Sequence, residues 1–167
     1  MFRIAATLCA LVLATLVASG CGEDPKVAYQ RDLRAVGARI ERALKQLPSG
    51  QQTVSARDIR ALSEALDEAA DDLDDIDAPE NVADAQRRFV RGLRGASAAY
   101  ADLARELAAA DTDAERADVF VSFATDDSID SAFTDMSGAQ ETLAAAGFRL
   151  FRAPQVLPAR AKTLPPA

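Results

Sequence analysis

Apolar residues recur through most of the chain at alternating steps of three and four, the spacing of one face of an α-helix. The first run extends from Lys26 to Leu47, and its apolar positions are Tyr29, Leu33, Val36, Ile40, Ala43 and Leu47. The second run has its apolar positions at Ile59, Leu62, Leu66, Ala69, Leu73 and Ile76. The third has them at Phe89, Leu93, Ala96, Tyr100, Leu103 and Leu107. The pattern therefore predicts three long amphipathic helices.

Residues that begin and end helices stand at the borders of these runs. Pro48 and Gly50 end the first helix, because neither residue favours a continued helix. Ser55 and Asp58 have the spacing of a capping box, which predicts the start of the second helix. Pro79 is tolerated in a first turn, so the third helix is expected over residues 79–109.

The region after residue 110 carries two apolar faces that do not share one helical register. The first face contains Ala117, Phe120, Val121 and Ala124. The second contains Ile129, Phe133, Met136, Gln140 and Leu143. Asp127 and Asp130 between them have the spacing of a capping pair, and Gly147 followed by Phe148 is typical of a Schellman helix end. These features predict two helices, over residues 112–124 and 128–146.

No stretch shows the strict alternation of a β-strand, so the predicted fold class is all-α. The simplest arrangement that buries the apolar faces is an antiparallel four-helix bundle in which the fourth region is split into two helices. The predicted bundle domain covers residues 26–150. Residues 151–167 contain four prolines and three basic residues, which predicts a disordered tail.

The first 20 residues have the composition of a secretory signal. Arg3 supplies a positive charge, residues 4–17 form an apolar run, and residues 18–20 are small. The apolar run is 14 residues long. A bilayer-spanning helix needs about 20 residues, so a permanent transmembrane helix is the weaker interpretation.

The small residues before Cys21, with Gly22 after it, resemble the lipobox of bacterial lipoproteins. That resemblance implies a diacylglycerol on the Cys21 thiol and cleavage of the leader just before it. Residues 21–25 would then be the lipidated cysteine and a polar spacer, and the protein would be anchored at the outer face of the cytoplasmic membrane. The sequence departs from the family at Ala18, the third residue before the cysteine, where leucine is usual. An ordinary signal peptide with a cysteine near its end is the alternative.

Composition excludes several classes of function. The chain has no histidine, and of its two cysteines Cys9 lies in the leader and Cys21 would be lipidated. Imidazole and thiol chemistry are therefore absent, no phosphate-binding glycine loop is present, and no cofactor is expected. Removal of residues 1–20 takes away Arg3 and no acid, which moves the formal net charge from −7 to −8 and disfavours nucleic acid. We expect a protein that is not an enzyme; a hydrolase that uses carboxylates alone would need two acids in one pocket.

An acidic face on the second predicted helix is the strongest local anomaly. Its members are Glu64, Asp67, Glu68, Asp71, Asp72, Asp74, Asp75 and Asp77. One hypothesis is a site for calcium or another hard cation, with Asp67, Asp71, Asp74 and Asp75 as ligands. The other is a solvated surface, partly neutralised from the third helix by Arg87, Arg88, Arg91 and Arg94.

The aromatic residues suggest a second candidate surface. Phe120 and Phe123 cannot both lie centrally on one narrow face beside Val121, so the short fourth helix is expected to leave apolar surface exposed. We predict an apolar contact surface formed by Phe120, Phe123, Phe148 and Phe151. The composition, rich in Ala, Arg and Asp, is similar to that of small helical lipoproteins of high-GC bacteria, which implies no activity. The leading hypothesis is an interaction or structural module at the membrane surface; the alternative is a lipoprotein that binds a cation or small ligand through its acidic helix.

Overall fold

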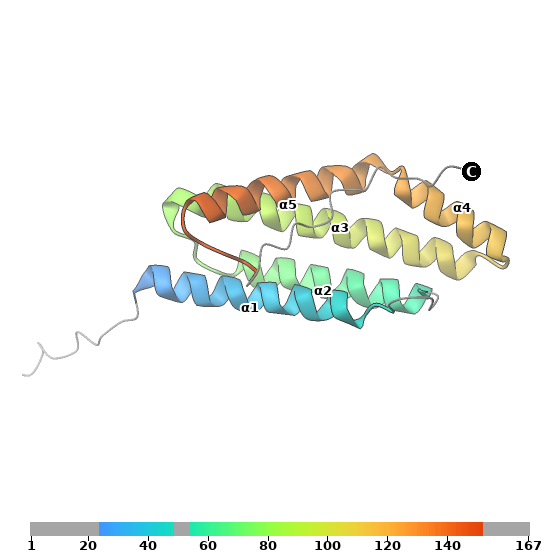
Figure 1. Ribbon diagram of the computed structural model, residues 1–167, viewed down its shortest axis with the longest axis horizontal. Coiled ribbons are helices and arrows are strands. Elements are labelled where there is room, and N and C mark those ends of the chain that lie inside the picture. Colours follow the sequence, from blue (N-terminus) through green and yellow to red (C-terminus); the bar gives the residue numbers. More distant parts are fainter. Residues whose placement is uncertain (1–23, 49–53, 152–167) are drawn as a thin grey trace, which may run out of the picture.

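The computed structural model describes residues 24–48 and 54–151, so the predicted leader, Cys21 and residues 152–167 of the predicted tail lie outside the described residues. The described ranges contain α-helices packed together and no strand, which confirms the all-α fold class. The helices are α1 (Pro25–Gln46), α2 (Ala56–Asp74), α3 (Ala83–Ala109), α4 (Asp113–Ala124) and α5 (Asp127–Ala145), with a 3-10 turn η1 (Glu80–Val82) before α3. Figure 1 shows α1 beside α2 and α5 beside α3, with α4 at one end of the molecule.

The predicted apolar faces of the three long helices form the core. The largest side chains that are almost completely buried are Phe89, Leu33, Leu73, Leu93, Leu143 and Val82. They belong to one cluster that takes residues from α1, α2, α3 and α5. A smaller cluster joins Ile59 at the start of α2 to Leu103 and Leu107 near the end of α3.

Two helix starts differ from the prediction. Pro79 has an extended backbone and its carbonyl accepts a hydrogen bond from the Val82 N–H (2.9 Å), so a 3-10 turn precedes α3 and the helix begins at Ala83. The cap of α5 is Asp126, whose carboxylate accepts from the Ser128 N–H (2.7 Å), and not the predicted Asp127. In both places a local hydrogen bond close to the helix start fixes the boundary.

The predicted capping box of α2 is present. The Asp58 N–H donates to Ser55 Oγ (3.3 Å), and the Ser55 N–H donates to the Asp58 carboxylate (3.0 Å). The hydrogen bonds from Ser55, that of its hydroxyl first, hold the pKa of Asp58 below its ordinary value. Thr112 and Glu115 form a second capping box at the start of α4, and the backbone N–H of Thr112 is the main cause of a lowered pKa at Glu115.

The C-terminal end of α5 is the predicted Schellman motif. Gly147 has a φ of 90°, the Phe148 N–H donates to the Leu143 carbonyl (2.9 Å) and the Gly147 N–H donates to the Ala144 carbonyl (3.0 Å). Glycine is favoured here because a side chain strains a backbone with positive φ.

Residues 147–151, here called the strap, cross from the end of α5 to α1 (Figure 1). Gln30 fixes the strap through both ends of its amide: its Nε2 donates to the Arg149 carbonyl (2.8 Å) and its Oε1 accepts from the Arg149 N–H (2.8 Å). Phe148, Leu150 and Phe151 are buried. The predicted exposure of Phe148 and Phe151 is therefore wrong, as is a tail that begins at residue 151, because these side chains complete the core over α1.

Tyr29 of α1 lies beneath the strap. Its ring meets the Phe148 ring edge to face, with centroids 4.9 Å apart. Its hydroxyl is buried and has no hydrogen-bond partner among the described residues. Burial raises the pKa of Tyr29 to about 12, because ionisation would place a phenolate in apolar surroundings.

Candidate functional site

The acidic face of α2 is crossed by arginines from both neighbouring helices. Arg94 of α3 donates through one nitrogen to Asp71 and Asp74, at 3.0 Å each. Arg39 of α1 lies 2.7 Å from a carboxylate oxygen of Asp72 and 3.6 Å from one of Glu68. The hydrogen bond with Asp71, followed by that with Asp74, raises the pKa of Arg94 above its ordinary value.

Of the four arginines predicted to neutralise the acidic face of α2, Arg94 is the one that pairs with it in the described part of the chain. Arg87 pairs with Asp84 on its own helix, and Arg88 donates to Asp135 of α5 (2.8 Å). Arg91 is exposed, and no ion pair is shown for it in the described part of the chain. Arg39 was missed, because its approach to α2 depends on how α1 packs and not on any spacing within α2.

The four predicted cation ligands do not converge in this arrangement. Asp71 and Asp74 both face the guanidinium of Arg94, whose positive charge competes with a metal ion for the same oxygens. Within residues 24–48 and 54–151, no group of three or more His, Cys, Asp or Glu side chains is placed to hold a metal ion. Calcium requires six to eight oxygen ligands, so the cation hypothesis gains no support from Asp67, Asp71, Asp74 and Asp75.

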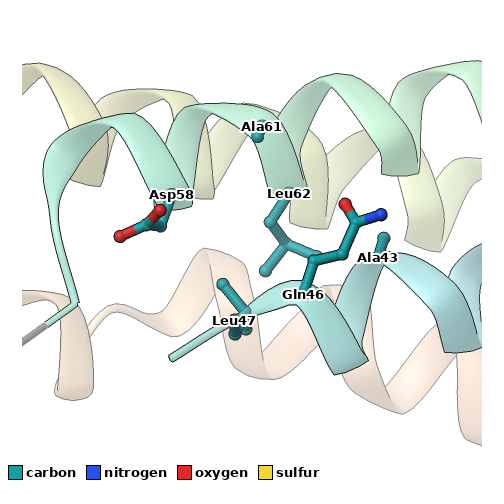
Figure 2. Close-up of a pocket in the computed structure, with 6 residues that line it drawn as sticks. All are labelled: Ala43, Gln46, Leu47, Asp58, Ala61 and Leu62. Atoms are coloured by element: carbon teal, nitrogen blue, oxygen red, sulfur yellow. The ribbon is translucent and has the colours of Figure 1, made fainter. Parts of the chain in front are cut away.

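A small cleft lies between the last turn of α1 and the first turns of α2 (Figure 2). Its volume is about 110 Å³. It is lined by Ala43, Gln46, Leu47, Asp58, Ala61 and Leu62. Sites for drug-sized molecules usually enclose about 300–1,000 Å³, and the Asp58 carboxylate at the edge of this cleft is already hydrogen-bonded to Ser55. The cleft therefore offers little to a substrate.

Helix α4 is different from the other helices because none of its residues is buried. It packs on α3 through Val119 and Phe123, which are both partly buried. The ring centroids of Phe123 and Tyr100 are 5.3 Å apart. The predicted apolar face of this helix points elsewhere. Its members Ala117, Phe120, Val121 and Ala124 are all exposed.

This exposed face is here called the outer face of α4, and it includes Phe120, one of the residues predicted to form an apolar contact surface. At about 100° per residue, it is centred roughly 130° around the helix from the direction of Val119 and Phe123. The side chains of Phe120 and Val121 are 40% and 64% exposed. Of the predicted apolar contact residues, Phe120 thus lies on this surface, whereas Phe123 packs against α3.

The surroundings of the outer face are strongly negative. Residues 111–130 contain seven acids and one base. The acids are Asp111, Asp113, Glu115, Asp118, Asp126, Asp127 and Asp130. The base, Arg116, pairs with Asp113 at 2.8 Å on the same helix. The outer face therefore lies in a segment of the chain with a strongly negative net charge.

The position of α4 is also distinctive. Figure 1 places it at the end of the molecule opposite the start of α1. Helix α1 has 22 residues, which gives it a length of roughly 33 Å at 1.5 Å per residue. The outer face is thus far from Asp24, the residue that caps the start of α1.

Comparison of the chain with protein-family models, curated proteins and solved structures gives no match. No helix in the described ranges is both long enough and apolar enough to cross a membrane. The lipidation site predicted at Cys21 lies outside the described residues.

Proposed function

We propose that the protein is an exported, lipid-anchored interaction module at the outer face of the cytoplasmic membrane, and that the outer face of α4 is its contact surface. The observation that supports this most directly is the exposure of Phe120 and Val121 on a helix with no buried residue. Exposed apolar patches on soluble proteins often mark interaction sites, and these two adjacent side chains are where such a site would lie on α4.

The proposed anchor agrees with the position of this surface. Cys21 precedes the cap residue Asp24 by three positions, so lipid on Cys21 would hold the start of α1 close to the bilayer. Helix α4 lies at the opposite end and would face away from the membrane (Figure 1). Two or three acyl chains on one residue anchor durably, whereas a single chain binds reversibly.

We further infer that α1, α2, α3 and α5 form a four-helix bundle, with α4 as an extension beyond its end. Support comes from the shared core cluster, which draws on all four helices. Only partly buried residues of α4 touch the two core clusters. In this arrangement the bundle acts as a rigid spacer that presents α4.

Replacement of Cys21 by alanine should release the protein from membranes. We expect the wild-type protein to sediment with the membrane fraction and to incorporate a labelled fatty acid, and the Cys21→Ala variant to lose both properties. Cys9→Ala, which changes the other cysteine, is the matched control and should retain both. If Cys21→Ala still sediments with membranes and keeps its leader, the anchor is a transmembrane helix and the lipoprotein proposal is wrong.

A photo-crosslinking residue at Val121 should capture a partner in intact membranes. We expect a discrete intermolecular product that disappears when Phe120→Glu is added, because the charge disrupts apolar contact. A crosslinker at Val27, which is 54% exposed near the start of α1, is the control for non-specific capture. Equal products from both positions, or a Val121 product that survives Phe120→Glu, would show that the outer face of α4 is not the contact surface.

A further inference from the structure

The outer face of α4 limits the chemistry of whatever covers it. Its apolar residues favour an apolar occupant, and the seven acids against one base in residues 111–130 favour a positively charged one. A second copy of this segment would bring the same negative charge, and anionic lipid would also be repelled.

Residues 152–167 of the same chain have the complementary composition. They contain three bases, Arg152, Arg160 and Lys162, and no acid. Their large apolar residues are Val156, Leu157 and Leu164, and they include four prolines. Proline-rich segments dock against aromatic side chains in several recognition domains, and Phe120 is the aromatic side chain of the outer face.

This segment is also long enough to reach α4. It begins directly after Phe151, which is buried, and the neighbouring Leu150 lies over Gly37 in the middle of α1. The distance from Gly37 to the end of α1 at Gln46 is about 14 Å along the helix. Across the molecule, α4 is separated from α1 by one or two interhelical distances of about 10 Å each. Leu164 follows Phe151 by 13 residues, and an extended chain of that length spans about 43 Å.

We propose that residues 152–167 bind the outer face of α4 within the same molecule and must be displaced before a partner binds. The displacement by a partner rests on the proposed function. The contact between residues 152–167 and α4 does not depend on it. Because the segment is covalently attached, its effective concentration is in the millimolar range, so even a weak contact would be well populated.

Hydrogen exchange of the full-length protein tests the contact. The variant carries Arg152→Glu, Arg160→Glu and Lys162→Glu, which turns complementary charge into like charge. We expect the amides of α4 to exchange about three- to tenfold faster than in the wild type, with α1 and α3 unchanged, because a covered helix opens less often. High salt should reduce the difference, since it screens the attraction.

The matched control reverses three arginines elsewhere. Arg34, Arg60 and Arg91 are exposed, and no ion pair is shown for them in the described part of the chain. Arg34→Glu, Arg60→Glu and Arg91→Glu give the same change in net charge and should leave exchange in α4 at the wild-type rate. A synthetic peptide of residues 152–167, added to the tail variant, should restore protection of α4, whereas the same peptide with the three bases reversed should not.

Three results would overturn the inference: equal exchange of α4 in wild type and tail variant, equal acceleration in the arginine control, or protection of α4 that rises with protein concentration, which would identify a second copy as the occupant.

The crosslinking experiment separates this inference from the proposed function. With the crosslinker at Val121, the tail variant should give more of the intermolecular product than the wild type. If no intermolecular product forms but α4 exchanges faster in the tail variant, the proposed function is wrong and the intramolecular contact stands. If wild type and tail variant give the same amount of product and the same exchange in α4, the intramolecular contact is wrong and the proposed function stands.

Discussion

Gly37→Ala should lower the free energy of unfolding by about 2–3 kcal/mol and lift the strap from α1. A Cβ at this position would clash with the Leu150 carbonyl oxygen and would lie 2.8 Å from the carbonyl carbon. Both are backbone atoms, so no side-chain rotation relieves the clash, and overpacking of this kind costs typically 1–3 kcal/mol or more. The helix gains about 1 kcal/mol from the replacement of glycine by alanine. The free-energy cost of partly exposing Phe148, Leu150 and Phe151 is larger than that gain.

Tyr29 reports whether the strap has moved. In the wild type, burial raises the pKa of Tyr29 to about 12. The neutral phenol therefore contributes stability that is complete below pH 10, the ordinary tyrosine value, and is lost as the pH rises through about 12. In Gly37→Ala we expect the pKa of Tyr29 to fall towards 10 and the alkaline loss of stability to shrink. Phenolate absorbance against pH measures the first, and urea unfolding at pH 8 and pH 11 measures the second.

Gly95→Ala is the control, because Gly95 is exposed and its added Cβ would meet only the Ala132 Cβ, at 3.2 Å. It should leave the titration of Tyr29 unchanged. Should Gly37→Ala prove as stable as the wild type, with an unaltered Tyr29 titration, the strap does not lie on α1 as described.

The long helices could be predicted from the sequence because their signals are local. Leu33, Leu73 and Phe89 follow the three-four spacing, and each is buried where that spacing places it. The Ser55 capping box and the Gly147 helix end likewise depend on residues within one or two turns of each other. Such features need no knowledge of the rest of the fold.

The strap could not be predicted because its contacts are distant in sequence. Gln30 and Arg149 are 119 positions apart, and nothing in either neighbourhood indicates the other. Phe148 and Phe151 follow the last helical stripe in a region without periodicity, so their apolar character predicted a surface as readily as a core. Their burial follows from the packing of the strap on α1.

The direction of α4 and the pairing of the acidic face show a second limit of sequence reasoning. Helix α4 has two apolar faces, and the one with fewer residues, Val119 and Phe123, is the one that packs, because it meets Tyr100 and the end of α3. The spacing on α2 located the acids correctly, but which arginines reach them depends on neighbouring helices. Arg94 was expected there, and Arg39 was not.

Gly92→Ala should lower the free energy of unfolding by about 2 kcal/mol, although alanine is the better helix former. An added Cβ would lie 2.6 Å from Met136 Cγ and 2.8 Å from the Ala132 carbonyl oxygen on α5. The backbone oxygen cannot turn away, so α3 and α5 must separate and open gaps beside Leu93 and Leu143 in a close-packed core. Thermal unfolding followed by circular dichroism, with urea titration at 25 °C, measures the loss.

Two other glycines isolate the packing part of this effect, since all three positions are helical and gain the same intrinsic propensity of about 1 kcal/mol with alanine. A Cβ at Gly138 would meet the tip of the Arg88 side chain at 2.9 Å, which is flexible and can move. Gly138→Ala and Gly95→Ala should therefore lie within about 1 kcal/mol of the wild type. If Gly92→Ala changes the free energy of unfolding by no more than these two variants do, α3 and α5 do not approach closely at Gly92. The packing of α5 on α3, and with it the position of the strap, would then be wrong. If it alone is strongly destabilised, the small residues in the middle of α3 are required for the contact with α5.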